Sequence, residues 1–502
     1  MELDRAAGIL LHVTSLPGPF GVGDFGCGTR RLIDFLQQTG QSIWQILPLS
    51  PPLHGNSPYS SASAFAGNPL FITPDGLHAS GWLTDSEYRA LTAGSPSSPH
   101  CDYTAARRAK LVMLHQAFRR FLSEGADRSP EYHEFCQRSS YWLDDYALFA
   151  AACEVHGTDD WSTWAPELAR RDPEALERLR KDHADSIAWT KFVQYVFDSQ
   201  WREVWHQASA AGIRVFGDLP IFVAYGSSDV WAHQHLFCLD HAGKPTVVAG
   251  VPPDYFSRTG QLWGNPLYDW QAVKADNYRW WVERLKWAFQ WHDVVRIDHF
   301  RAFEAYWEIP AGARTAVGGR WVPGPGREVF DVATAQIGPL NIVAEDLGMI
   351  TPEVHALREA LGMPGMRVLQ FGFDSEDDTY HRPESYPHDC VAYTGTHDNS
   401  TIIGWYQQCP PTTKARVGRY LQQEPQSLPL HLKFASMLFR SQAGWAIVPM
   451  QDLLGLDDRA RMNVPGRAEG NWTWRLVPEQ LTEELSQQVR TLSCSHGRAR
   501  CP

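Results

Sequence analysis

The sequence contains the stretch Val294-Val295-Arg296-Ile297-Asp298-His299-Phe300, an apolar, β-branched run that ends in polar residues. This pattern predicts a short buried strand followed by a loop. Because side chains alternate along a strand, Arg296 and Asp298 are expected on the same side, where the guanidinium favours the ionised acid and lowers its pKa. Such a carboxylate suits a nucleophile, a metal ligand or a charge-stabilising group, although a structural Arg–Asp pair would give the same pattern. The rest of the chain has to decide between these interpretations.

Strand-like segments alternate with helix-like segments along the whole chain, which predicts a parallel sheet with helical crossovers. The strands are expected at residues 8–13, 42–47, 213–216, 294–300, 341–344, 367–371, 390–393 and 446–450. A closed (β/α)8 barrel needs this number of strands. The predicted fold class is therefore α/β: a (β/α)8 TIM barrel with inserted, largely helical subdomains and no separate C-terminal β-domain.

The chain is expected to form one barrel domain over 1–502, interrupted by insertions. These insertions are predicted at about 49–210 (a loop and a helical subdomain), about 219–277 (a loop region) and about 311–340 (a hairpin and a helix). Apolar residues recur at helical spacing in 105–122, 141–155 and 187–208. Residues 246–270 resemble a loop, 314–326 a hairpin, and 494–502 a loose tail.

Composition limits the classes of partner. The formal net charge is -12 and there is no basic run, which argues against nucleic acid as the main partner. No segment approaches the roughly 20 apolar residues of a membrane helix, and the acidic start at residues 1–5 is unlike a signal peptide. The nine Cys, scattered without CxxC spacing, are expected to be reduced thiols of a cytoplasmic protein. Most of the 21 Trp are expected in the core.

Polar residues stand at the carboxyl ends of several predicted strands: Asp218, Asp298, Glu345 and Thr396-His397-Asp398-Asn399. In a (β/α)8 barrel this face carries the chemistry. Carboxylates that converge there repel one another unless positive groups or protons intervene, and Arg296, His299 and His397 are placed to supply them. The pattern therefore favours a functional site over a structural cluster.

Two kinds of chemistry use converging carboxylates. A metal centre is disfavoured, because ligand spacings of the DxDxDG and HExxH types are missing from the sequence. Glycoside chemistry uses one carboxylate as nucleophile and a second as acid and then base, about 5–5.5 Å apart in retaining enzymes. Asp298 beside Arg296 fits the nucleophile. Glu345, flanked by Ala344 and near Asp346, fits an acid kept protonated by burial and by like charge.

The sequence also resembles the 4-α-glucanotransferases (amylomaltases, or disproportionating enzymes), which are relatives of the α-amylases. The matching motifs run in family order over nearly the whole chain, and together they are highly specific. They are GILLHVTSLP at 8–17, WQILPL at 44–49, SPY at 57–59, FGDLP at 216–220, PPDYF at 252–256, WGNPLY at 263–268, RIDHF at 296–300, AEDLG at 344–348, YTGTHDN at 393–399 and RMNVPG at 461–466.

This resemblance implies a role for each matching residue. Asp298 corresponds to the nucleophile, Glu345 to the general acid/base, and Asp398 to the carboxylate that grips the sugar hydroxyls in the transition state. The residues implied to surround the same glucose unit are Arg296, Asp218, His299 and His397. The other implied substrate contacts are Tyr59 on the early loop, Asp254, Tyr255, Phe256, Gln261 and Trp263 on a loop that covers the glucan, and Asn463. No cofactor and no metal are expected.

The resemblance predicts retaining transfer between maltooligosaccharides or other α-1,4-glucans, with glucose as an acceptor and neither nucleic acid nor membrane as partner. Two alternatives stay open: an α-amylase-like hydrolase with the same carboxylates, and a non-catalytic glucan-binding protein on the same barrel. Some positions depart from the usual family pattern, namely His54, Asn56, Ser60, Ala302 and Ser400. None removes the catalytic set, and the early-loop departures concern acceptor or secondary glucan binding.

Overall fold

The computed structural model describes residues 1–53, 55–92, 98–253, 257–376 and 379–500. Its central sheet has eight strands, all paired in parallel. In spatial order they are β10 (Gly365–Val368), β11 (Cys390–Tyr393), β12 (Trp445–Pro449), β1 (Ala6–Leu10), β2 (Ile43–Gln45), β3 (Arg214–Pro220), β6 (Val294–Asp298) and β9 (Ile342–Ala344). The Ala344 N–H donates to the Pro364 carbonyl at 2.9 Å and so joins the last strand to the first. The predicted (β/α)8 barrel is confirmed.

The barrel strands form because their sequences are apolar on both faces. Ile9, Ile43, Val215 and Ile447 are fully buried, as expected for parallel strands covered by helices outside and by side chains inside. At one place the packing requires glycine: a Cβ on Gly8 would lie 2.6 Å from the Cβ of Ile43. The first two strands can therefore approach each other only with glycine at this position.

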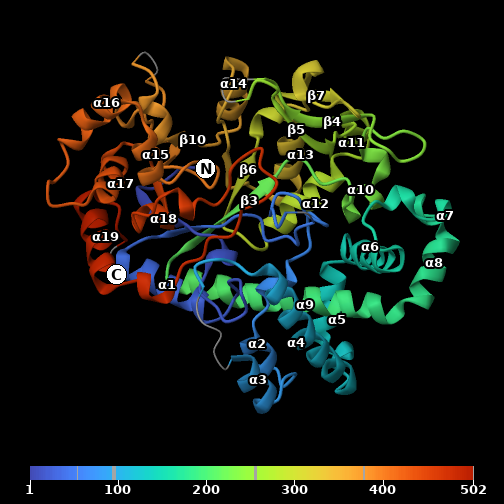
Figure 1. Cartoon of the computed structure of the whole chain (residues 1–502). Coiled ribbons are helices and arrows are strands. Elements are labelled where there is room, and N and C mark those ends of the chain that lie inside the picture. Colours follow the sequence, from blue (N-terminus) through green and yellow to red (C-terminus); the bar gives the residue numbers. More distant parts are fainter. Residues whose placement is uncertain (54, 93–97, 254–256, 377–378, 501–502) are drawn as a thin grey trace.

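Helices surround the barrel and fill the long connection between β2 and β3 (Figure 1). That connection holds α2 (Pro74–Ala79), α3 (Asp85–Thr92), α4 (Tyr103–Ser123), α5 (Pro130–Arg138), α6 (Leu143–His156), α7 (Pro166–Ala169), α8 (Pro173–Asp182) and α9 (Ala184–Ala210). The other helices are α1 (Cys27–Thr39), α10 (Ser228–Ala232), α11 (Trp270–Ala275), α12 (Arg279–Ala288), α13 (Glu328–Ile337), α14 (Pro352–Ala360), α15 (Ile402–Gln408), α16 (Pro411–Leu421), α17 (Leu430–Arg440), α18 (Met450–Leu453) and α19 (Glu483–Ser495). The three segments with helical spacing are thus helices, within a few residues at each end.

A second, antiparallel sheet lies beside the barrel, in the order β5 (Gln261–Pro266), β4 (Val247–Val251), β7 (Ala305–Pro310) and β8 (Arg320–Pro323). The prediction of a loop at 246–270 is therefore wrong, since this segment contains β4 and β5. The hairpin predicted at 314–326 is also wrong in extent, because its first strand is β7. These strands are short and hold Gly and Pro, and β4 pairs with β7, more than 50 residues away, so the sequence shows no local alternation.

The loose tail predicted at 494–502 is wrong for residues 494–500, which are the ones that the structure describes. Arg498 is 1% exposed, and burial lowers its pKa to about 9, with nearby Arg5 adding to the effect. Its guanidinium donates to the carbonyl groups of Ala6, Phe439, Ser441, Ala443 and Gly444. These carbonyls lie at the end of α17 and at the starts of β1 and β12, so one side chain ties the chain terminus to the bottom of the barrel.

Replacing Arg498 by Met should lower the free energy of unfolding by at least about 3 kcal/mol, because several buried carbonyl groups lose their donor. Equilibrium unfolding in urea, followed by Trp fluorescence, measures the change. Arg500→Met is the matched control: Arg500 donates to the Gly212 carbonyl at the surface, so the change should stay within about 0.5 kcal/mol. Equal effects of the two substitutions would show that Arg498 does not anchor the terminus.

Candidate active site

Arg296 lies between two carboxylates at the carboxyl ends of β3 and β6. Its Nη1 donates to Asp218 Oδ1 at 2.8 Å and to Oδ2 at 2.7 Å, and its Nη2 donates to Asp298 Oδ1 at 2.8 Å. Asp218 and Arg296 are register partners in the sheet, which explains why their side chains meet. One buried guanidinium therefore fixes the position of both carboxylates.

The protonation of this group follows from a competition between burial and charge. Burial disfavours the charged form of Arg296, but Asp218 and Asp298 more than offset this and raise its pKa well above the ordinary value. The expectation that the pKa of Asp298 is lowered is wrong. Burial raises the pKa of Asp298, and the attraction of Arg296 only opposes that increase. The hydrogen bond from Arg296 still favours the ionised form of Asp298 over what burial alone would allow.

Glu345 follows β9 and faces the end of β6, because Ala344 pairs with Ile297. Its Oε2 accepts from the His299 N–H at 2.7 Å, and its Oε1 accepts from the Leu347 N–H at 2.9 Å. Burial raises the pKa of Glu345 to about 7, the negative charge of Asp298 adds to this, and Arg296 and the two N–H groups oppose it. Burial and like charge, the two causes inferred from the sequence, both act on this group.

The backbone of His299 is shaped to meet Glu345. Its φ of 54° and ψ of 46° lie in the left-handed region, which a residue other than glycine rarely adopts. This conformation turns the N–H of His299 toward the Glu345 carboxylate. Burial lowers the pKa of the His299 imidazole to about 3, so the ring is neutral. Trp263 presents its ring to this imidazole edge-on, with the ring centroids 4.9 Å apart.

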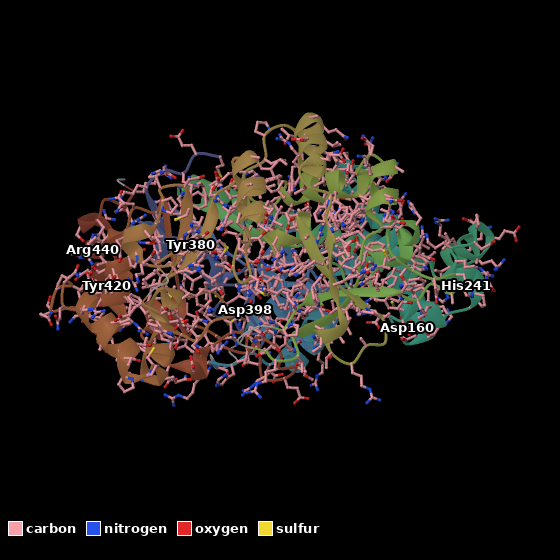
Figure 2. The ribbon with its side chains drawn as sticks, turned by 90° about the horizontal axis from the view of Figure 1, so that it is seen from above. Asp160, His241, Tyr380, Asp398, Tyr420 and Arg440 are labelled. Carbon is pink, nitrogen blue, oxygen red and sulfur yellow. The ribbon has the colours of Figure 1, made fainter. Side chains whose placement is uncertain are left out.

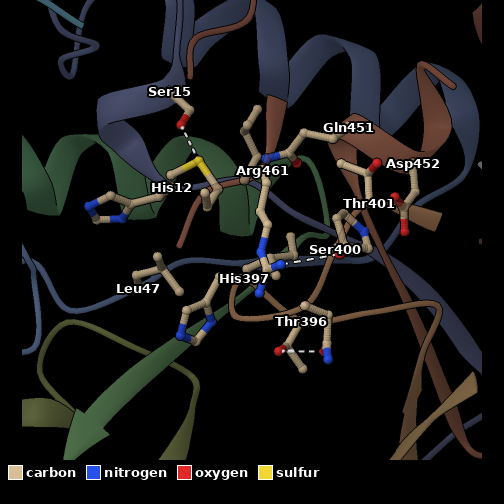
Figure 3. A pocket seen from close by; sticks show the side chains of 15 residues that line it. His12, Ser15, Leu47, Thr396, His397, Ser400, Thr401, Gln451, Asp452 and Arg461 are labelled. Atoms are coloured by element: carbon tan, nitrogen blue, oxygen red, sulfur yellow. Dashed lines mark hydrogen bonds between the residues drawn. The ribbon is translucent and has the colours of Figure 1, made fainter. Parts of the chain in front are cut away.

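Asp398 is in the loop after β11, near the middle of the molecule in the view of Figure 2. Its Oδ1 accepts from Asn463 Nδ2 at 2.6 Å, and its Oδ2 lies 3.4 Å from His397 Nε2. Arg461 holds the same loop: it donates to the Asp398 carbonyl, to the Asn463 carbonyl at 2.7 Å and to Ser400 Oγ at 3.1 Å (Figure 3). The loops after β11 and α18 thus orient this carboxylate together.

Tyr59, in the loop after β2, contacts both Asp218 and His397. Its hydroxyl donates to Asp218 Oδ2 at 2.6 Å, and burial, reinforced by the negative charge of Asp218, raises its pKa well above the ordinary value. Its ring stacks on His397 with 5.1 Å between centroids and 15° between planes. Trp472 packs against both of these rings. The loop after β2 is therefore part of the same site as the carboxyl end of β3 and the loop after β11.

The structure brings most of the predicted site residues together at the carboxyl ends of the barrel strands. Asp254, Tyr255 and Phe256 lie outside the described residues. Gln261 is on β5, where its side-chain oxygen accepts from Trp263 Nε1 at 3.1 Å. Sequence reasoning missed two residues of the site, Arg461 and Trp472. The position of Arg461 at the start of a family motif was a usable signal, whereas no periodicity or spacing distinguishes Trp472 from a core tryptophan.

A small open pocket adjoins the site, with His397 as part of its lining (Figure 3). It is lined by the loops after β1, β11 and β12, including His12, Thr396, Gln451 and Arg461. Burial lowers the pKa of His12 to about 3, and the nearby His397 adds to the effect. The pocket is thus lined by apolar side chains and by polar groups of several kinds, among them the Arg461 guanidinium and the Asp452 carboxyl, whose pKa burial raises to about 7.

Two further findings concern the described part of the chain only. No group of three or more His, Cys, Asp or Glu side chains there is arranged to hold a metal ion. Among its helices, none is both long enough and apolar enough to cross a membrane.

The arrangement offers three carboxylates with different environments around one opening of the barrel. Asp298 is bonded to a cation, Glu345 is half-buried with a pKa of about 7, and Asp398 keeps 44% of its side chain exposed while Asn463 orients it. A carboxyl group held by a cation, beside an acid that exchanges its proton near neutrality, can carry out nucleophilic and acid/base steps on one substrate.

Comparisons with known proteins agree with this chemistry. A family model described as 4-alpha-glucanotransferase matches residues 11–481. The chain is 46% identical to a 4-alpha-glucanotransferase from Thermus thermophilus, over 98% of this chain and 99% of that protein, and 46% identical to one from Synechocystis sp., over 98% of each. An amylomaltase from Streptococcus agalactiae, solved in complex with acarbose, superposes with a TM-score of 0.94 at 37% identity, over 99% of this chain and all of that chain. The chain therefore belongs to the 4-α-glucanotransferase family.

Proposed function

We propose that the chain transfers α-1,4-glucan segments with retention of configuration, and that Asp298 is the nucleophile, Glu345 the acid/base and Asp398 the group that stabilises the transition state. The activity, that of a 4-α-glucanotransferase on α-glucans, is the activity of its family. The different surroundings of Glu345 and Asp298 support this assignment of roles. Glu345 has a pKa of about 7, whereas Asp298 is bonded to Arg296.

In the first step, a carboxylate oxygen of Asp298 attacks the anomeric carbon of the donor glucan. The glycosidic bond breaks as the new ester bond forms, and Glu345 gives its proton to the departing oxygen. The products are a β-glucosyl ester on Asp298 and a shortened glucan with a free 4-hydroxyl. Arg296 Nη2 holds Asp298 by Oδ1, which fixes the orientation of the attacking carboxylate.

In the second step, the ionised Glu345 removes the proton from the 4-hydroxyl of an acceptor glucan or of glucose. That oxygen attacks the anomeric carbon, the ester bond to Asp298 breaks, and Glu345 ends protonated as it began. Two inversions give overall retention. Because Glu345 acts once as acid and once as base, a pKa near 7 serves both steps close to neutral pH.

The surrounding residues hold the reacting glucose. Asp398 binds the sugar hydroxyls more strongly in the transition state than in the ground state. Around it we place Tyr59, Asp218, Arg296, His299, His397 and Asn463. Among the described residues, we assign the covering role to Gln261 and Trp263, which favour transfer by restricting the access of water to the ester. No cofactor takes part in either step.

The substrates we propose are maltooligosaccharides and other α-1,4-glucans, with glucose as the smallest acceptor, in the cytoplasm. Hydrolysis by the same carboxylates would differ only in the second step, with water in place of the acceptor. A glucan-binding protein without activity would not need an acid whose pKa is raised to about 7. We also propose that the whole chain is one barrel domain with three insertions, at about 49–210, 219–277 and 311–340.

Incubation of the purified protein with maltotriose alone should give glucose and a ladder of longer maltooligosaccharides. The total number of reducing ends should stay constant, because each transfer breaks one glycosidic bond and forms another. Chromatography of the products and a reducing-end assay measure both quantities. Rising reducing ends with only glucose and maltose would identify a hydrolase, and binding without products would identify a binding protein.

Asp298→Asn and Glu345→Gln should each lower kcat for maltotriose, by roughly 10⁴-fold and by about 10²–10⁴-fold respectively, because each removes a reacting group and keeps its shape. Glu304→Gln is the matched control. It removes a carboxylate that pairs with Arg301 at 3.8 Å in the turn after β6, and it should leave kcat within about twofold. A correctly folded Asp298→Asn variant with normal kcat would refute the mechanism.

Glu345 should set the alkaline limb of the pH profile, with kcat/KM falling as pH rises above about 7, because the acid is then ionised before the first step.

The raised pKa of Glu345 also predicts an effect of pH on the stability of the fold. Since its pKa is raised from 4.5 to about 7 on folding, the native state keeps a proton that the unfolded state loses, so its contribution to stability declines from pH 4.5 to about 7. Thermal unfolding of Glu345→Gln should lack this decline, and an identical pH dependence in both proteins would contradict it.

A further inference from the structure

Trp472 has a backbone conformation that its side chain does not favour. Its φ is 62°, in the left-handed region, and only 4% of the residue is exposed. A bulky aromatic residue rarely adopts this conformation, because its Cβ crowds the neighbouring carbonyl oxygen. His299 shares this feature within the same site, and there the conformation serves Glu345. The conformation of Trp472 is therefore also expected to position a group of the site.

Long-range hydrogen bonds hold the Trp472 backbone on both sides. Its N–H donates to the Met462 carbonyl at 2.6 Å, and its carbonyl accepts from the Tyr103 hydroxyl at 2.7 Å. The next residue, Thr473, accepts from the Cys101 N–H at 2.6 Å. One set of contacts comes from the loop after α18 and the other from the region where α4 begins, so two distant segments impose the conformation.

The conformation places the indole ring against two residues of the site. Its centroid is 6.0 Å from that of Tyr59, with 41° between the planes, and 5.9 Å from that of His397, with 35° between the planes. Tyr59 and His397 also stack on each other, so the three rings form one cluster. Rings packed on two sides lose most of their rotational freedom.

Each of the two partner rings leads to a carboxylate. The Tyr59 hydroxyl donates to Asp218, which is bonded through Arg296 to Asp298. His397 precedes Asp398 in the chain, and its Nε2 lies 3.4 Å from that carboxylate. The cluster therefore reaches Asp298 from one side and Asp398 from the other, while Trp472 itself is buried behind both rings.

We propose that Trp472 is a positioning residue for the transfer reaction: its left-handed backbone directs the indole against Tyr59 and His397 and so fixes the groups that orient Asp298 and Asp398. This role rests on the proposed function. Trp472 is buried, and it acts through the two rings that it packs against, those of Tyr59 and His397. A residue of this kind contributes to kcat more than to KM, because the geometry that it preserves matters most in the transition state.

Trp472→Leu tests the proposal, and Tyr278→Leu is its matched control. Tyr278 is also buried, aromatic and left-handed, with a φ of 55°, but it lies at the start of α12. Both substitutions should lower Tm. Only Trp472→Leu should lower kcat for maltotriose, by roughly 10²-fold with KM changed less than about threefold, as expected for a small displacement of catalytic groups. Trp472→Phe, which keeps an aromatic ring, should restore kcat to within about tenfold of the unmodified protein.

A double-mutant cycle with Tyr59→Phe, which removes the hydroxyl that reaches Asp218, tests the route. If Trp472 acts partly through Tyr59, the kcat loss of the double variant should be smaller than the product of the single losses. Multiplicative losses, a normal kcat in Trp472→Leu, or an equal kcat loss in Tyr278→Leu would overturn the role of Trp472. If the unmodified protein made no transfer products from maltotriose, the proposed function itself would fail.

Discussion

The site depends on the guanidinium of Arg296, which is shared between Asp218 on β3 and Asp298 on β6. Two carboxylates buried this close together would repel each other or take up protons if no cation lay between them. A planar guanidinium donates to both at once, in a fork that the ammonium group of a lysine cannot reproduce. The same contact joins two adjacent barrel strands, so the sheet and the charge balance of the site depend on one side chain.

Surroundings rather than residue type then separate the roles of the three acids. Asp298 is held next to a cation, whereas the half-buried Glu345 accepts from two backbone N–H groups and feels the charge of Asp298. Asp398 stays partly exposed and is oriented by Asn463. The pKa of Glu345, about 7, is a balance, because Arg296 acts on it against burial and against Asp298. Losing the guanidinium would therefore disturb both Asp298 and Glu345.

The eight barrel strands were predictable because strands buried on both faces are continuous apolar runs, and their polar ends mark the site. The small sheet was missed because β4 and β5 contain Gly or Pro and pair with distant segments. The buried end of the chain was missed because Arg498 binds carbonyl groups that are adjacent only after folding. The predicted shift in the pKa of Asp298 had the wrong direction, because the prediction considered the pair with Arg296 and left out burial.

Two left-handed residues, His299 and Trp472, show how the scaffold supports the site. Neither conformation is favoured locally, and each persists because hydrogen bonds from other parts of the fold impose it. A site that is held rigid by the fold is an advantage in a transfer reaction. In the mechanism that we propose, the acceptor position is empty after the first glucan fragment leaves, while the ester on Asp298 persists. Carboxylates ordered only by bound sugar would lose their arrangement at that stage, whereas carboxylates ordered by the fold keep it until the acceptor arrives.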